Sequence, residues 1–91
     1  MQTSSTQTFN RNFNLGPDKS GSSSTRITIS YNPVYIDKPK VSLSCSSSDS
    51  RTVCYIESED NLHCVVFLYN PNWDNGASGS ITVTAVGMVW K

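Results

Sequence analysis

The amino-acid sequence predicts an all-β fold, a small antiparallel β-sandwich of about six strands. Strand-like runs recur at intervals of roughly 10–15 residues, and residues that favour turns separate them. Nowhere does a helical periodicity of apolar residues persist, so no amphipathic helix is predicted. The 91 residues suffice for one small domain, and a domain of this size is only marginally stable alone. We therefore expect contacts between subunits to supplement its core.

The beginning of the chain differs in pattern from the rest. Residues 1–14 place two phenylalanines among polar side chains. We expect them to form an edge strand or a tie between subunits, because a chain terminus is ordered only when something holds it. Gly16–Ser24 has the composition of a loop. Residues 1–26 are thus predicted to be an N-terminal segment and loop, and residues 27–91 the β-sandwich domain.

Alternation of apolar and polar residues marks most of the predicted strands. Ile27–Tyr31, Val41–Cys45 and Ile81–Val86 alternate, as expected of strands with one buried face. Arg51–Ile56 has strand composition as well. Leu62–Tyr69 is apolar at nearly every position, so we expect a central strand whose two faces are covered by the other sheet or by another subunit.

Composition and charge exclude several kinds of partner. The formal net charge is zero and the pI is about 6.5, so nucleic acid is not an expected partner. No apolar run is long enough for a membrane helix, and the first residues lack the pattern of a signal peptide. Polarity comes mainly from Ser, Thr and Asn, which occupy 32 of the 91 positions (16, 8 and 8). Such a composition is typical of extracellular or virion-surface β-proteins.

The three cysteines do not form a disulfide framework. Cys45, Cys54 and Cys64 are an odd number, so at least one is free or pairs between chains. Each lies in a predicted strand, where a buried cysteine acts as a small apolar residue. Cys45 and Cys54 could still bridge neighbouring strands in an oxidising compartment.

Neither a metal site nor an active site is predicted, and no cofactor is expected. No pair among the cysteines and His63 has the short spacing of zinc-binding motifs. There is one histidine and no G-x-S-x-G motif. Glu57 and Glu59 are two close carboxylates, but they belong to a short acidic turn with no evident pocket. The sequence therefore favours a binding or structural protein over an enzyme.

One polar loop carries a large aromatic residue. Asn70–Gly76 is rich in Asn, Pro, Asp and Gly, which favour turns, and it contains Trp73 between Asn72 and Asp74. A sugar has hydroxyls that form hydrogen bonds and a C–H face that packs on an aromatic ring. This loop is therefore a candidate carbohydrate site. The alternative is a tryptophan that folds back onto the edge of the sandwich.

From Ile27 onward the order of elements resembles the H-type lectin domain of snail agglutinins and of the C-terminal module of discoidins. Ile27–Ile29 matches the first common strand of that family, and Pro39–Ser44 matches its Pro-x-Val-x-x-Ser motif. The last matching stretch is Ala85–Gly87. The chain departs from the family at Thr84, where a tryptophan is common, and it lacks the Gly-Phe that usually opens the preceding strand. The resemblance implies a trimer that binds galactose or N-acetylgalactosamine where subunits meet.

The same resemblance implies a set of carbohydrate-binding residues. Arg51 stands where the family has an arginine that binds the sugar, and Trp73 and Asp74 stand near its tryptophan and the polar residue that follows. Asn72 could add donors and acceptors, and Asp18 could correspond to the family's upstream acidic ligand. The alternative for Arg51 is an ion pair with an acidic residue of the turn at 57–60.

Compact sandwiches of this pattern are also similar to the tip domains of phage tail fibres and receptor-binding proteins, which are trimeric and often bind host glycans. The alternative to a lectin-like protein is therefore a receptor-binding tip, or a structural knob that only trimerises a fibre. Met88 and Trp90 would expose an apolar patch at the C-terminus. We expect a contact between subunits to cover them.

Overall fold

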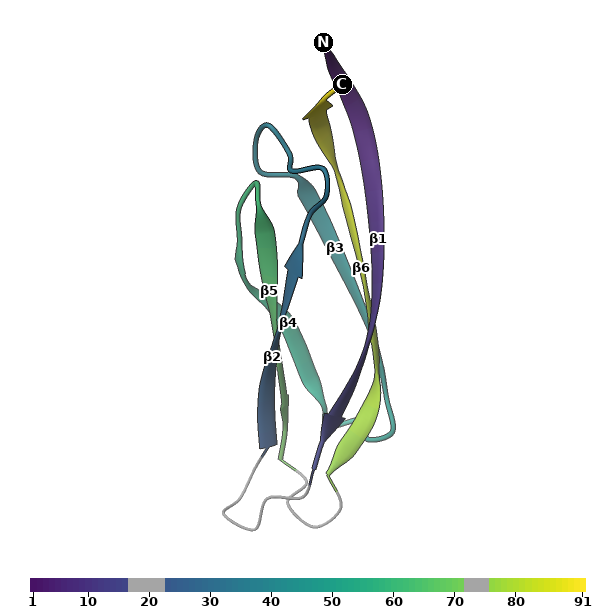
Figure 1. The fold of residues 1–91 in the computed structure, drawn as a ribbon. Coiled ribbons are helices and arrows are strands. Elements are labelled where there is room, and N and C mark those ends of the chain that lie inside the picture. Colours follow the sequence, from purple (N-terminus) through teal and green to yellow (C-terminus); the bar gives the residue numbers. More distant parts are fainter. Residues whose placement is uncertain (17–22, 72–75) are drawn as a thin grey trace.

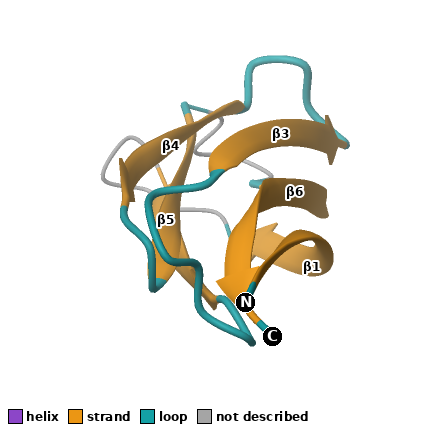
Figure 2. Cartoon of the chain, turned by 90° about the horizontal axis from the view of Figure 1, so that it is seen from above, coloured by secondary structure: helices purple, strands orange, loops and turns teal. Residues whose placement is uncertain are grey.

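The computed structural model describes residues 1–16, 23–71 and 76–91. In these residues, six strands form two antiparallel three-stranded sheets with the strand orders β1-β6-β3 and β2-β5-β4 (Figure 1). The strands are β1 (Gln2–Leu15), β2 (Ser23–Ser30), β3 (Lys40–Ser47), β4 (Val53–Glu59), β5 (His63–Asn70) and β6 (Ala77–Trp90). The sheets lie as two facing layers (Figure 2). The predicted all-β antiparallel sandwich is confirmed.

The longest strand ladder joins the two ends of the chain. β1 and β6 pair over all 14 residues of each strand, from Gln2 opposite Trp90 to Leu15 opposite Ala77. A backbone hydrogen bond of 2.8 Å joins the last residue to the first, so the termini lie side by side (Figure 1). The molecule is elongated, with principal extents of 53 × 18 × 15 Å. β1 is an edge strand of its sheet, while the division of the chain at residue 26 stays a prediction.

The core lies between the sheets and follows the two-residue period of the strands. Its buried apolar residues are Phe13, Leu15, Ile29, Tyr31, Tyr35, Cys64, Val66, Leu68, Ala77, Ile81, Val83, Ala85 and Val89. In β2, Ile29 is buried and Ile27 packs against this cluster. The alternation in the sequence therefore predicts correctly which face of the strand points inward.

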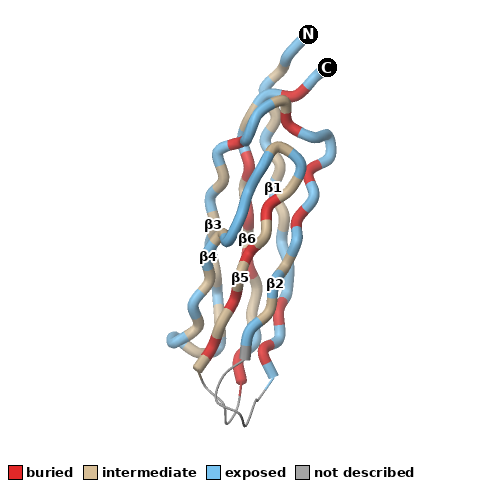
Figure 3. Tube along the Cα trace, turned by 90° about the vertical axis from the view of Figure 1, so that its left-hand side faces the viewer, coloured by how far each residue is buried: buried red, intermediate tan, exposed pale blue. Residues whose placement is uncertain are grey.

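The central strand β5 is covered on one face within this chain. Cys64, Val66 and Leu68 are fully buried, whereas the alternate residues Val65 and Phe67 are partly exposed. Figure 3 shows the outer side of this sheet, with buried and intermediate positions alternating along β5. Within the chain, the other sheet covers the inner face of β5, and cover of the outer face by another subunit stays a prediction.

A segment without regular structure, residues 31–39, closes the sandwich near the termini. Its buried anchor is Tyr35, whose hydroxyl lies 2.9 Å from the carbonyl oxygen of Ala85 and 3.1 Å from that of Ser5, so it can donate to either. The Tyr35 ring occupies the space that a Cβ at Gly87 would need. Tyr35 therefore ties the segment to both long strands, and a glycine in β6 makes room for its ring.

Candidate functional site

Most of the residues predicted to bind carbohydrate lie outside the described part of the chain. These are Asp18, Asn72, Trp73 and Asp74. Arg51 is described, and it lies in the turn that joins β3 to β4, two residues before β4 begins. The expectation that Arg51 opens its strand is therefore wrong by two residues. Its place beside Trp73 stays a prediction.

Arg51 is held by an acidic residue of its own turn. The Nη2 atom of Arg51 lies 2.9 Å from Oδ2 of Asp49, and its Nε donates to Oδ1 at 3.2 Å. The backbone N–H of Arg51 also donates to Oδ1, at 2.9 Å. The carboxylate of Asp49 thus fixes both the turn and the guanidinium. Arg51 forms an ion pair, as the alternative interpretation predicts, but its partner is Asp49 and not an acidic residue of the turn at 57–60.

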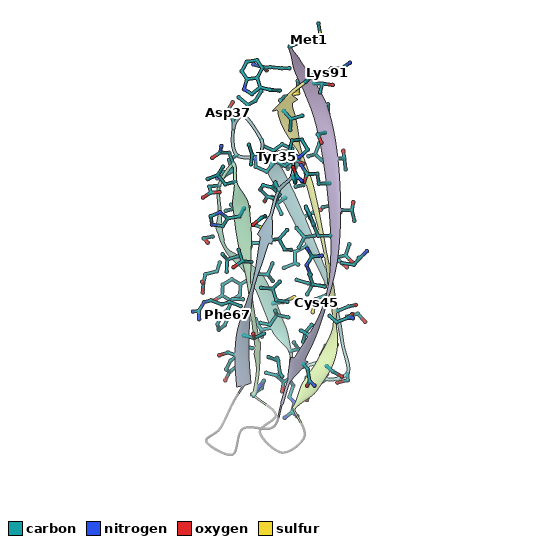
Figure 4. All side chains as sticks on the ribbon, in the orientation of Figure 1. Met1, Tyr35, Asp37, Cys45, Phe67 and Lys91 are labelled. Carbon is teal, nitrogen blue, oxygen red and sulfur yellow. The ribbon has the colours of Figure 1, made fainter. Side chains whose placement is uncertain are left out.

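A cluster of aromatic side chains lies elsewhere, on the outer face of the β2-β5-β4 sheet. We name Tyr55, Phe67 and Tyr69 the aromatic strip. Tyr55 lies directly opposite Phe67 in the ladder between β4 and β5, and their ring centroids are 5.4 Å apart at an interplanar angle of 45°. The Tyr55 residue is 48% exposed. Figure 4 shows Phe67 on the side of its sheet that faces away from β1, β3 and β6.

Arg26 crosses the aromatic strip from the other edge strand. It lies opposite Phe67 in the ladder between β2 and β5, and its guanidinium carbon is 4.9 Å from the centroid of the Phe67 ring. Its Nε atom donates to both carboxylate oxygens of Glu57 on β4, at 2.8 and 3.1 Å. Arg26 therefore spans the sheet, with its charge over an aromatic ring and its end held by a carboxylate.

Glu57 lies at a β-bulge of β4, on the same face as Tyr55. The register between β4 and β5 shifts between Ile56 and Ser58, so Glu57 is the extra residue of β4. A bulge re-aims the side chain that it inserts, and Glu57 reaches Arg26 two strands away. The hydrogen bond with Arg26 lowers the pKa of Glu57, and the same bond raises the pKa of Arg26.

The other acidic residues near this end of β4 have partners of their own. Glu59 lies 3.6 Å from the amine of Lys38. Asp60 accepts hydrogen bonds from the backbone N–H groups of Leu62 and His63, at 2.8 and 2.9 Å. These two bonds, with that from His63 the stronger, lower the pKa of Asp60. The acidic run is thus part of the turn between β4 and β5 and contributes only Glu57 to the aromatic strip.

Sequence reasoning missed the aromatic strip for a physical reason. The alternate aromatic residues of β5 are visible in the sequence, but they were attributed to a strand covered on both faces. Only the ladder shows that Tyr55 and Arg26 flank Phe67 in one row. The available signal is the pair Phe67 and Tyr69, two aromatic residues at alternate positions next to a strand that carries Tyr55.

The arrangement suits the binding of a polar ligand that has an apolar face. Partly exposed rings offer a packing surface, and the Arg26–Glu57 pair offers oriented donors and acceptors beside it. In residues 1–16, 23–71 and 76–91 there is no group of three or more His, Cys, Asp or Glu side chains that could hold a metal ion. The same residues contain no helix long and apolar enough to cross a membrane.

Comparison with known proteins identifies a solved structure with a similar fold. No family model matches the chain, and no curated protein matches it, so the resemblance to H-type lectins stays a prediction. Among solved structures, the chain is similar to the tailspike gp61 of Pseudomonas phage phi297, with a TM-score of 0.63 and 14% identity. The match covers 89% of this chain and 15% of the tailspike chain. At this identity the likeness shows the fold alone.

Proposed function

We propose that this chain is an attachment module of a tailspike- or tail-fibre-type virion protein, and that it binds glycans of the host surface through the aromatic strip. The observation that carries the first part is the likeness of nearly the whole chain to one portion of a phage tailspike. The neutral Ser, Thr and Asn composition supports a place on the virion surface.

The aromatic strip supports glycan binding on chemical grounds. The C–H face of a pyranose ring packs on the exposed ring of Tyr55, and the guanidinium of Arg26 and the carboxylate of Glu57 donate to and accept from its hydroxyls. Glu57 and Phe67 already fix the Arg26 side chain, so little further ordering is required when the ligand binds. The Arg26–Glu57 pair therefore acts as a prearranged polar edge beside an apolar floor.

The small extent of this surface favours a saccharide over a second copy of the chain. The surface that contains the strip runs about 13 Å along β5 from Val65 to Tyr69, and three strands span about 14 Å, which gives an area of roughly 200 Å². A stable protein interface needs about 800 Å² on each partner. The strip alone is too small for such an interface but large enough for one or two sugar rings.

A single site of this kind binds weakly, with a Kd of roughly millimolar to tens of micromolar, because few ligand atoms are buried. Display on a trimer would raise the avidity for a dense glycan layer by about 10²–10⁴. We therefore propose a homotrimer as the working form, which light scattering on the purified protein tests directly.

A glycan array followed by ligand-detected NMR titration tests the site. We expect Tyr55→Ala to weaken binding at least about tenfold, and Tyr55→Phe, which keeps the ring, to weaken it less. Thr84→Ala is the control, because Thr84 lies at a central position on the outer face of the other sheet. Its affinity should stay within about twofold of the wild type.

The same experiment includes the loop site predicted from the sequence. Loss of binding in Arg51→Ala and Trp73→Ala, with Tyr55→Ala unaffected, would move the site to that loop and support galactose or N-acetylgalactosamine recognition as the lectin resemblance implies. If the trimer binds no glycan, the chain is instead a structural knob. If no trimer forms either, the likeness to a tailspike is one of fold only.

A further inference from the structure

A polar contact links the two sheets where β3 passes into β4. These are edge strands of opposite sheets, joined by the turn at residues 48–52. The hydroxyl oxygens of Ser47 and Thr52 lie 2.7 Å apart across this turn, and Asn70 donates to the Thr52 hydroxyl at 2.7 Å. The Ser47–Thr52 contact therefore marks the first pair of side chains that face each other along the open edge of the sandwich.

The next pair along this edge consists of two cysteines. Side chains on one face of a strand recur every second residue. Moving away from the turn, the next position on the same face after Ser47 is therefore Cys45 in β3, and the next after Thr52 is Cys54 in β4. Both pack against the buried core, and both are free thiols of intermediate exposure. Figure 4 shows Cys45 well away from the chain termini. The two cysteines therefore face each other from opposite sheets.

The thiol of Cys54 lies in an apolar environment that includes the thiol of Cys45. Burial, and then a hydrogen bond with the thiol of Cys45, raises the pKa of Cys54 to about 12. β3 and β4 approach one another, and a disulfide between them requires Cα atoms about 4.4–6.8 Å apart. The third cysteine is in a different environment: Cys64 is fully buried on β5, and this burial raises the pKa of its thiol.

We propose that Cys45 and Cys54 form a disulfide that joins the two sheets once the protein meets an oxidising environment. The inference rests on the geometry of this edge and not on the proposed attachment function. With oxidised glutathione as the oxidant, the first protein thiolate attacks the glutathione disulfide and releases one glutathione thiolate. The second protein thiolate then attacks the mixed disulfide and releases another. The protein loses two hydrogen atoms, and two molecules of reduced glutathione form.

The bond would close a ring of ten residues, from Cys45 to Cys54. At this edge the side chains of Ser47 and Thr52 already link the two sheets through a hydrogen bond. A cross-link of this size restricts the unfolded chain and raises the melting temperature by about 10 °C. Both sulfurs must be deprotonated in turn, and Cys54 is scarcely ionised at neutral pH. The oxidation is therefore expected to be slow. A reducing cell interior favours the two thiols, and an oxidising exterior favours the disulfide.

The test is mass spectrometry of the full chain before and after incubation with oxidised glutathione. We expect the mass to fall by two hydrogen atoms, peptide mapping to join Cys45 to Cys54, and alkylation of the unfolded product to label Cys64 alone. Cys64→Ala should still form the bond, whereas Cys45→Ser should not. The oxidised wild type should melt about 10 °C above its reduced form.

Three other results would overturn the proposal. They are three alkylatable thiols after prolonged oxidation, a bond that includes Cys64, and disulfide-linked dimers on a non-reducing gel. If Cys45→Ser is poorly folded, Cys54→Ala provides the same comparison from the opposite sheet.

Discussion

The outer faces of the two sheets differ in chemistry, although each sheet has three antiparallel strands. On the β2-β5-β4 sheet, the row through Phe67 places Arg26 and Tyr55 on either side of a central aromatic ring. On the β1-β6-β3 sheet, the equivalent central positions are Thr82 and Thr84. One outer face thus offers aromatic and charged groups, and the other offers hydroxyls.

The hydroxyl face is regular across all three of its strands. Its successive rows are Ser42–Thr84–Thr8, Ser44–Thr82–Asn10 and Ser46–Ser80–Asn12. None of these nine side chains is charged, and the hydroxyl of Thr82 donates to Oδ1 of Asn10 at 2.8 Å. Small polar side chains of this kind satisfy one another and water equally well. This face explains much of the Ser, Thr and Asn composition.

The largest expected effect concerns how tightly the hydroxyl-faced sheet is packed. A Cβ at Gly79 in β6 would collide with the backbone carbonyl oxygen of Ser46 in β3, and backbone cannot move aside as a flexible side chain can. We expect Gly79→Ala to destabilise the protein by at least about 3 kcal/mol, measured by urea denaturation. Gly16→Ala is the control, because no heavy atom of the described residues, apart from Gly16 and its chain neighbours, lies within 4 Å of its Cβ position. Equal stability of the two variants would show that β3 and β6 are not held this closely.

The next prediction compares the two outer faces directly. Phe67→Ala removes a ring that contacts both Tyr55 and the Arg26 guanidinium, so we expect a loss of about 2 kcal/mol. Thr84→Ala, at a central position of the other sheet, should change stability by less than about 0.5 kcal/mol. Urea denaturation of both variants measures the difference. If the two variants lost similar amounts of stability, the aromatic strip would contribute no more to folding than the hydroxyl face does. The two faces would then differ only in composition.

The sequence is sufficient to predict the fold because the strands alternate so clearly. The two-residue period in Ile27–Tyr31 and Ile81–Val86 indicates both strand and inward face, and turn-forming residues separate the runs. What it does not contain is the pairing. β1 lies far from β6 in the chain, yet the two strands form the longest ladder of the molecule, and no local pattern in residues 1–14 specifies that partner.

The candidate site could be predicted less well for the same reason. Arg51 is a predicted site residue because it stands where the lectin family has a sugar-binding arginine, but its guanidinium is bound to Asp49 two residues away. Arg26 drew no attention, although it is the arginine that lies over an aromatic ring. Its partner Glu57 is 31 residues distant and reaches it through a bulge. A site built across three strands depends on register, which alternation alone does not determine.

The end of β6 breaks the simple contrast between the two faces. Val86, Met88 and Trp90 continue the outer face of the hydroxyl sheet toward the termini, and Trp90 is 65% exposed. An exposed apolar run of this kind marks an interaction site, and we predicted from the sequence that another subunit covers it. Trp90→Ser should shift the protein from trimer toward monomer in size-exclusion chromatography with light scattering. Val53→Ser, an equally apolar exposed position on β4, should leave the trimer intact.

Either of two results would contradict this subunit contact. A wild-type protein that is monomeric at all concentrations would leave the apolar end of β6 uncovered in solution. A trimer unchanged by Trp90→Ser would place the contact elsewhere, and the aromatic strip, already too small to hold a subunit alone, would have to be part of a larger interface.

The smallest expected effect is electrostatic and belongs to the aromatic face alone. Arg26 lowers the pKa of Glu57 in the folded protein, so the folded state favours the ionised carboxylate. Its contribution to stability is therefore present above the unfolded-state pKa of about 4.3 and is lost as the pH falls through the lower folded-state pKa. Glu57→Gln should lower the melting temperature by a few degrees at most at pH 7, because the pair is exposed to solvent.

The difference between wild type and Glu57→Gln should shrink in melts recorded at successively lower pH, and it should disappear once Glu57 is protonated in the folded protein. Glu59→Gln is the control, since Glu59 contacts Lys38 at the longer distance of 3.6 Å and should show a smaller difference at pH 7. A gap that stays constant from pH 7 to pH 2 would mean that Glu57 acts through packing and not through its charge. Arg26 would then be positioned by Phe67, and the carboxylate could not serve as the prearranged acceptor at the edge of the aromatic strip.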